Sequence, residues 1–104
     1  CHATGTLIGD GIELRALSEA YGAAGAPPAA GAAAKTCAIG SVKGNIGHAN
    51  AAAGVTGLIK TALCLQRRQL VPTAHYATLN AKVVLEGTPF YVHEGLGPAP
   101  WPRP

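Results

Sequence analysis

The chain has 104 residues, of which 48% are hydrophobic but only 5% aromatic, so it can form one modest core at most. Its formal net charge of +3 comes from scattered basic residues, and no basic stripe indicates a nucleic-acid partner. No apolar run reaches membrane-spanning length before Lys60 interrupts it, which argues against a transmembrane segment.

The three cysteines, Cys1, Cys37 and Cys64, form neither a Cys-x-x-Cys pair nor an even-numbered disulfide framework. A reducing compartment fits this cysteine usage, and no signal-peptide pattern is present, so we expect a cytoplasmic protein. Because the chain opens on Cys1 in the middle of a motif, we also expect it to be part of a longer domain.

The opening segment CHATGTLIGD places His2 before a turn rich in threonine and glycine. Asp10 is suited to cap a helix over residues 11–21, and Gly22 is suited to end it. Residues 22–35 are a low-complexity run of glycine, alanine and proline with two adjacent prolines, for which we predict a surface loop.

The next segment is a β-prone run, residues 36–42, which leads into the glycine-punctuated sequence GSVKGNIGHANAAAG. We predict a short buried strand followed by a loop that carries Lys43, Asn45 and His48. Glycines in this loop allow positive φ and a close approach to a ligand. A cation and an imidazole on a turn that feeds a helix N-terminus can stabilise a developing negative charge.

Apolar residues recur at helical spacing over residues 50–68, which predicts a core helix with Asn50 as its N-cap. Small residues on this helix, including Gly57, favour very close packing of another element. Beyond it we predict short strands at residues 70–74 and 90–93, and an irregular tail because GPAPWPRP is rich in proline.

Residue types alone leave other interpretations open. An isolated histidine is more often structural, and Lys43 could be an ordinary surface lysine. The glycine loop is not a phosphate-binding loop of the GxxxxGK[ST] type, because Lys43 precedes its glycine. A zinc site made from Cys1, His2, Cys37 and His48 lacks ligand spacing, so we expect no metal.

Two motifs, CHATGTLIGDGIE and GSVKGNIGHANAAAGVTGLIK, occur in the order and at the separation found in β-ketoacyl synthases. The chain resembles the C-terminal part of a ketosynthase domain of a type I polyketide synthase, and the downstream sequence follows the same pattern. This resemblance implies an α/β fold, namely the C-terminal fragment of a thiolase-like αβαβα condensing-enzyme fold. Residues 1–104 would form one partial ketosynthase domain, with the 22–35 loop inside it.

The resemblance also implies catalytic roles for four residues. His2 and His48 would donate hydrogen bonds to the thioester carbonyl of a malonyl-type extender, so we expect their rings to share one cavity. Lys43 would be a buried ammonium that orients His48 and lies within salt-bridge reach of Glu13.

The activity implied by the resemblance is a decarboxylative Claisen condensation, by an acyltransferase of polyketide or fatty-acid biosynthesis. The malonyl unit would arrive on the 4'-phosphopantetheine arm of an acyl carrier protein, which Thr4 and Thr6 would contact, and no cofactor would be bound. Further partners would be neighbouring domains of a multidomain synthase and a second copy of the domain in a homodimer. The NIGH wording around His48 favours polyketide or animal-type multidomain enzymes.

The family's nucleophilic cysteine lies well upstream of these motifs, and none of the three cysteines here has its context. Each is expected to be a small buried apolar residue, so the chain would supply the two-histidine half of a site and be inactive alone. The alternative is a non-condensing, ketosynthase-like interaction or chain-length partner that lacks the nucleophile. Five positions depart from the family pattern: Ala3 for Gly, Gly11 for Pro, Gly44 for Ser, Ala49 for Thr and Asn50 for Glu.

Overall fold

A computed structural model describes residues 1–23 and 35–101, so the predicted 22–35 loop lies outside the described residues except at its two edges. The chain forms three α-helices, one 3-10 helix and four short strands in this part of the sequence. Their bounds are α1 Gly9–Ala23, β1 Cys37–Ile39, α2 Lys43–Ile46, η1 Asn50–Ala52, α3 Ala53–Arg67, β2 Gln69–Leu70, β3 Phe90–Val92 and β4 Ala99–Pro100.

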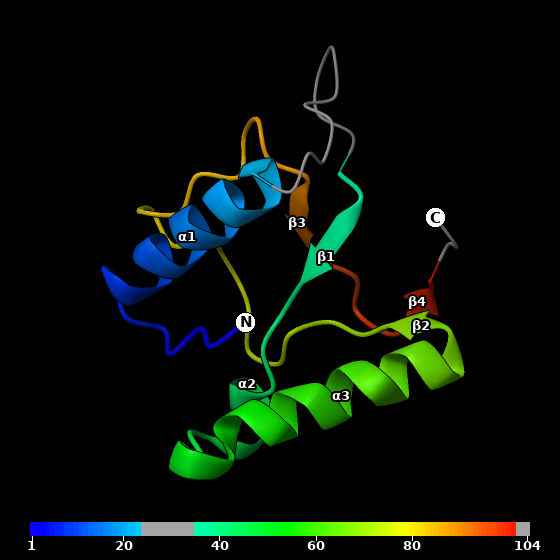
Figure 1. Ribbon diagram of the computed structural model, residues 1–104. Coiled ribbons are helices and arrows are strands. Elements are labelled where there is room, and N and C mark those ends of the chain that lie inside the picture. The colour runs from blue at the N-terminus through cyan, green and yellow to red at the C-terminus, as the bar shows by residue number, and fades with distance from the viewer. Residues whose placement is uncertain (24–34, 102–104) are drawn as a thin grey trace.

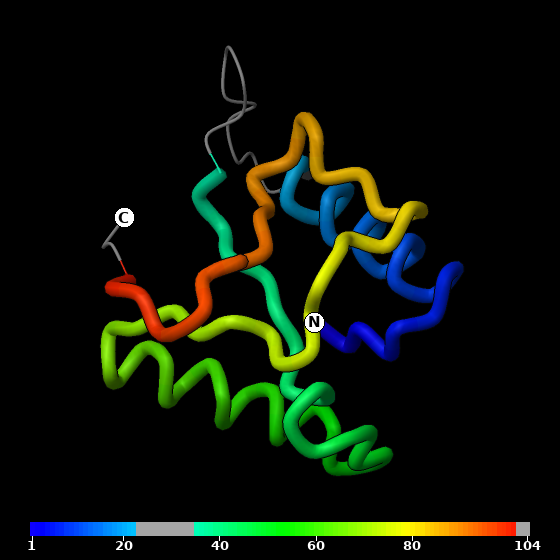
Figure 2. Tube along the Cα trace, turned by 180° about the vertical axis from the view of Figure 1, so that it is seen from behind, coloured from blue at the N-terminus to red at the C-terminus, as the bar shows by residue number. Residues whose placement is uncertain are grey.

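The two long helices lie at different sides of a small parallel ribbon (Figure 1). Strands β1 and β3 pair in parallel, with Cys37 opposite Phe90 and Ile39 opposite Val92, and α1 lies beside this pair. Strands β2 and β4 pair antiparallel above the C-terminal end of α3. In both views the N-terminus lies between α1 and α2 (Figure 2). The first residues are therefore near the centre of the molecule.

The core is small and centres on Phe90, whose side chain is only 1% exposed. The Tyr21 ring meets it edge-on with the two ring centroids 5.0 Å apart, so α1 packs on β3 through an aromatic pair. Leu14 and Leu70 are the other buried large apolar residues among those described. This core holds α1 against the ribbon.

The first predicted helix is confirmed, but it begins earlier than expected and Asp10 is not its cap. Thr6 takes that role: its Oγ1 accepts a hydrogen bond from the Gly9 N–H at 3.2 Å, and its carbonyl accepts one from the Asp10 N–H at 3.3 Å. Asp10 instead accepts a hydrogen bond from the Gly5 N–H at 3.2 Å, which stabilises the preceding turn.

The prediction of Asn50 as a side-chain cap is also wrong. A 3-10 turn precedes α3, whose N-cap is Ala52 without any side-chain hydrogen bond. Asn50 adopts φ 47°, a left-handed conformation that asparagine tolerates better than most residues. Further upstream, the expected glycine loop contains the one-turn helix α2, whose C-cap is Gly47 with φ 74°.

The strands are shorter than predicted, and the tail is not wholly irregular. The strand expected at 70–74 is reduced to Gln69–Leu70, and the proline-rich tail supplies its partner β4. A two-residue edge pairing tolerates Pro100, because an edge strand does not need every N–H. The Trp101 N–H then donates to the Arg68 carbonyl at 2.9 Å, which ties the tail to the end of α3.

The prediction that α3 is a core helix does not hold for the described part of the chain. No residue of α3 is buried, and its large apolar side chains are about half exposed or more: Val55 52%, Leu58 67%, Ile59 53%, Leu63 46% and Leu65 58%. The helix pattern is present, but residues 1–23 and 35–101 do not supply enough apolar surface to cover it. None of the described helices is long and apolar enough to cross a membrane.

From this exposure we predict that the 104-residue chain alone unfolds without a cooperative transition. Each Å² of apolar area buried contributes about 25 cal/mol, against roughly 1.5 kcal/mol of ordering entropy per residue, and few side chains here are buried. Urea titration followed by near-UV circular dichroism, together with amide hydrogen exchange, would check this. A sharp transition with strongly protected α3 amides would contradict the prediction.

Candidate functional site

The two histidines that the sequence singled out lie side by side. The ring centroids of His2 and His48 are 5.0 Å apart, and the ring planes meet at 79°. The two rings come from separate turns, one before α1 and one between α2 and η1. The two rings therefore approach each other, and both side chains are exposed.

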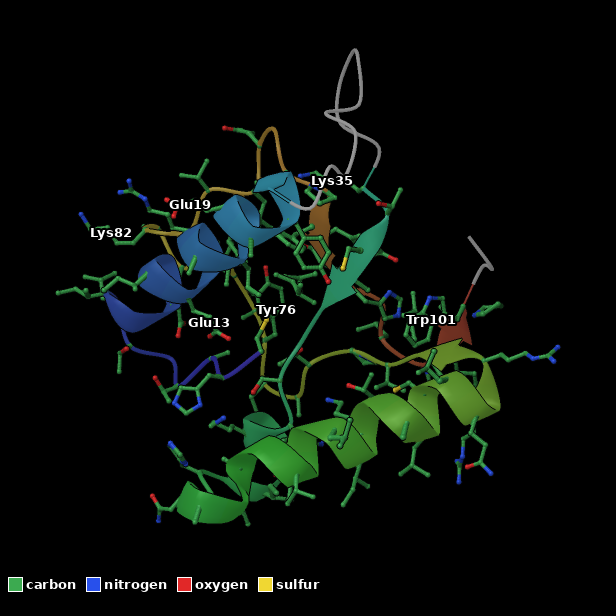
Figure 3. All side chains as sticks on the ribbon, viewed as in Figure 1. Glu13, Glu19, Lys35, Tyr76, Lys82 and Trp101 are labelled. Atoms are coloured by element: carbon green, nitrogen blue, oxygen red, sulfur yellow. The ribbon has the colours of Figure 1, made fainter. Side chains whose placement is uncertain are left out.

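The His2 turn is held by a carboxylate from α1. Glu13 accepts a hydrogen bond from the His2 N–H at 2.5 Å on one oxygen and from the Ala3 N–H at 2.8 Å on the other. Figure 3 shows Glu13 on the side of α1 that faces the N-terminal segment. Such charge-assisted hydrogen bonds are the stronger kind, so Glu13 fixes the backbone that carries the His2 ring.

The predicted ion pair between Glu13 and Lys43 is wrong. Both Glu13 oxygens are engaged by backbone N–H groups, and within residues 1–23 and 35–101 the one ion pair is Arg15–Glu19 on the exposed face of α1. Lys43 is half-buried rather than buried, and its backbone N–H donates to Ser41 Oγ at 3.2 Å. Its ammonium thus has no carboxylate partner in the described part of the chain.

The His48 ring is oriented by the backbone that follows it. Its Nδ1 accepts a hydrogen bond from the Asn50 N–H at 3.0 Å. A neutral imidazole that accepts at Nδ1 carries its proton on Nε2. The arrangement therefore leaves Nε2–H as the donor of this ring.

Both histidine turns are attached to one short strip of backbone, Gly40–Ser41, which we call the junction strip. The Cys1 nitrogen donates to the Gly40 carbonyl at 2.8 Å, and Lys60 Nζ donates to the Ser41 carbonyl at 2.8 Å. Ser41 is only 6% exposed, and its N–H donates to Thr73 Oγ1 at 3.3 Å. The strip thus links the first residues, α3 and the segment after β2.

Two open hollows border the junction strip. The first hollow measures about 420 Å³ and is lined by the half-buried Lys43 and Lys60, so we call it the lysine hollow. Its lining also includes Cys1, His2, Cys64 and Trp101. The second, of about 820 Å³, is called the threonine hollow; its lining includes Thr4, Asp10, Lys43, Tyr76 and Asn80. Lys43 lines both hollows, whereas His48 lines neither. The prediction that the two histidine rings share one cavity is therefore wrong: the rings lie side by side without lining the same hollow.

The two predicted substrate-binding threonines are placed differently. Thr4 lines the threonine hollow, whereas the Thr6 hydroxyl caps α1 and Thr6 does not line that hollow. Their side-chain oxygens are 3.5 Å apart. Of the pair, only Thr4 lines this hollow.

Two tyrosines near these elements are kept neutral. Burial raises the pKa of Tyr76, and the negative charge of Glu94 raises it further. Electrostatic interaction with Cys37, a hydrogen bond to that side chain and burial raise the pKa of Tyr21. Both phenols therefore stay protonated at neutral pH and can serve as donors.

The three cysteines are free, but their expected burial is only partly met. Cys37 and Cys64 are half-buried, whereas Cys1 is exposed because it begins the turn before α1. Among the residues that the structure describes, no group of three or more histidine, cysteine or acidic side chains could hold a metal ion.

Sequence reasoning missed three residues that hold the site together: Ser41, Lys60 and Asn80. Asn80 Nδ2 donates to the Thr6 and Leu7 carbonyls at 3.2 and 3.3 Å, and its Oδ1 accepts from the Lys82 N–H at 2.9 Å. The signal for Asn80 was its residue type in a loop, where asparagine side chains often bond to nearby backbone. Nothing in the local sequence indicated the long-range contact of Lys60.

Comparison with known proteins identifies relatives along the whole chain. Residues 1–77 match the family described as "Beta-ketoacyl synthase, C-terminal domain". The chain is 48% identical over 103 residues to polyketide synthase ThaG of Burkholderia thailandensis, covering 99% of this chain and 2% of that protein. It is 47% identical over 94 residues to polyketide synthase PksM of Bacillus subtilis, covering 89% of this chain and 2% of that protein.

The fold also matches solved ketosynthases. The ketosynthase from module 6 of the bacillaene synthase of Bacillus subtilis aligns with a TM-score of 0.80 and 43% identity, covering 98% of this chain and 17% of that one. Ketosynthase twelve of the bacillaene synthase from Bacillus amyloliquefaciens aligns with a TM-score of 0.81 and 40% identity, covering 99% and 17%. The expected thiolase-like fragment is thereby confirmed, and the chain spans a small part of each relative.

Glycine at position 44 is required by a close backbone approach. A Cβ there would lie 2.3 Å from the carbonyl oxygen of Ala74, a distance that forces one of the two segments to move. The resemblance expects serine at this position, whereas the glycine found here leaves room for the Ala74 carbonyl.

We therefore predict that Gly44→Ala lowers the free energy of unfolding by about 1–3 kcal/mol, as overpacking does. The measurement needs a complete domain, for example the Bacillus subtilis module 6 ketosynthase with residues 1–104 grafted in place of its matching segment, called here the grafted ketosynthase. Gly22→Ala is the control, because a Cβ at this α1 position meets nothing within 4 Å. Equal thermal unfolding temperatures for the two variants would contradict the prediction.

Proposed function

Because this chain belongs to the β-ketoacyl synthase family, within its C-terminal domain, we propose that it supplies the two-histidine half of a polyketide ketosynthase site. The reaction is the decarboxylative Claisen condensation of a malonyl-type extender with an acyl group held on a cysteine outside this chain. The observation that supports it best is the contact between the His2 and His48 rings, 5.0 Å apart on separate turns.

The histidines act on the first step. The bond between the extender's α-carbon and its carboxylate breaks, CO₂ leaves, and the electron pair forms an enolate whose charge rests on the thioester oxygen. His48 donates its Nε2–H to that oxygen, and His2 donates from the adjacent turn. Donors fixed before the charge develops stabilise it without reorganisation, and each is typically worth about 10²–10³ in rate.

The second step joins the two acyl units. The enolate α-carbon attacks the acyl thioester carbonyl on the cysteine, a carbon–carbon bond forms, the carbon–sulfur bond breaks, and the cysteine leaves as a thiolate. Lys43 adds positive charge near the enolate, because its ammonium has no carboxylate partner among the described residues and it lines both hollows. Glu13 acts through the backbone of the His2 turn.

The substrate arrives on the 4'-phosphopantetheine arm of an acyl carrier protein, and Thr4 contacts that arm in the threonine hollow. Two features support this placement: the hollow is open and measures about 820 Å³, and it contains both Thr4 and Lys43. The partners are the carrier protein, neighbouring domains of a multidomain synthase and a second ketosynthase copy. The names of the relatives support a polyketide product rather than a fatty acid.

We predict that His2→Ala and His48→Ala each lower malonyl decarboxylation by the grafted ketosynthase about 10²–10³-fold. The combined variant should lose less than the product of the two factors, because both donors act on one oxygen. Release of labelled CO₂ from malonyl carrier protein, without an acyl primer, measures this step separately from condensation.

Glu86→Ala is the matched control. Glu86 is exposed and lines neither hollow, so this variant should decarboxylate at the rate of the unmodified graft. Wild-type rates for the His2 and His48 variants would refute the proposed function. A graft that binds malonyl carrier protein but releases no CO₂ would favour the non-condensing alternative.

A further inference from the structure

Lys60 makes a long-range side-chain contact from the middle of α3 to the site. Its Nζ donates to the Ser41 carbonyl at 2.8 Å, across 19 residues of sequence. The side chain is half-buried and lines the lysine hollow together with His2 and Lys43. Most other side chains of α3 are exposed, so this contact is unusual for its helix.

The contact has no compensating carboxylate. The one ion pair within residues 1–23 and 35–101 is Arg15–Glu19, on α1. A half-buried ammonium without a counter-ion carries a desolvation cost, because it loses water without gaining an opposite charge. A carbonyl acceptor offsets part of this cost, and one of the three N–H groups of Lys60 is used in this way.

The position of Lys60 closes the segment that carries His48. That segment starts at Ser41, continues through α2 and His48, and ends where α3 begins at Ala53. One end is joined to α3 covalently, and the Lys60–Ser41 hydrogen bond joins the other end to the same helix. The segment is therefore a closed loop whose shape depends on this bond.

The same bond affects the other histidine through the junction strip. The Cys1 nitrogen donates to the Gly40 carbonyl, next to the carbonyl that Lys60 holds. Movement of the strip would therefore shift both the backbone beside His2 and the loop of His48. The separation of the two rings would then depend on where α3 holds Ser41.

We propose that Lys60 is a positioning residue of the ketosynthase site: its ammonium closes the Ser41–Ala53 loop and thereby sets His48 against His2. This inference rests on the function proposed above. It assigns Lys60 no contact with substrate, and it predicts that the charge matters through geometry rather than through binding.

The test compares Lys60→Met and Lys60→Arg in the grafted ketosynthase. Methionine keeps an unbranched side chain one atom shorter than that of lysine and removes the donor. We expect kcat for malonyl decarboxylation to fall about 10–100-fold, because small misplacements of catalytic groups are costly. KM for malonyl carrier protein should change less than about threefold. Arginine can still donate to the Ser41 carbonyl, so it should retain at least about a third of the rate.

Combination with His48→Ala separates positioning from a loss of folded protein. If Lys60 acts through His48, Lys60→Met should change the residual rate of the His48→Ala variant less than about threefold. A merely structural effect would multiply with the His48 effect instead. Lys82→Met is the control, because Lys82 is exposed at the outer side of α1, away from the junction strip (Figure 3).

The outcomes distinguish this inference from the proposed function. Loss of decarboxylation in His48→Ala but not in Lys60→Met would overturn the role of Lys60 alone, whereas no effect of either histidine variant would overturn the function. A crystal structure of the Lys60→Met graft gives a readout that needs no turnover. Rings that stay about 5 Å apart as in the parent chain, on an unmoved Ser41, would also overturn the inference.

Discussion

Hydrogen bonding to the Gly40–Ser41 carbonyls is the constraint on which the site depends. Strand β1 ends at Ile39, so these two residues no longer need their polar groups for the ribbon and can accept donors from elsewhere. The Cys1 nitrogen takes one carbonyl and Lys60 takes the other. The register of β1 against β3 therefore sets where both histidine turns are attached.

The acidic and basic side chains of the site differ in how fully they are paired. Glu13 accepts hydrogen bonds from two backbone N–H groups, whereas Lys60 Nζ binds the Ser41 carbonyl, and neither Lys43 nor Lys60 has an ion-pair partner within the described residues. The two lysines therefore bring positive charge without a paired carboxylate to the lysine hollow, which His2 also lines. In the proposed reaction this charge would favour an enolate oxygen, because positive groups fixed in advance stabilise developing negative charge.

Two of the departures from the family pattern gain a physical meaning from the backbone. Asn50 stands at φ 47°, where asparagine is tolerated better than glutamate, and its N–H donates to the His48 ring. Ala3 stands at φ 35°, where the family has glycine, so this turn is strained and depends on the Glu13 hydrogen bonds to keep its shape. No contact explains Ala49 in place of threonine.

The sequence by itself determined the two long helices, the strand candidates, the family and the pair of histidines, because these depend on local periodicity and on motif spacing. It did not determine that Glu13 binds the His2 turn rather than Lys43, or that Thr6 rather than Asp10 caps α1, because competing partners are chosen by distances across the fold. The Lys60–Ser41 bond was equally invisible, since it joins segments brought together only when α3 lies along the end of β1. Tertiary structure decided these partners because a polar side chain binds whichever donor or acceptor the packed backbone leaves within about 3 Å.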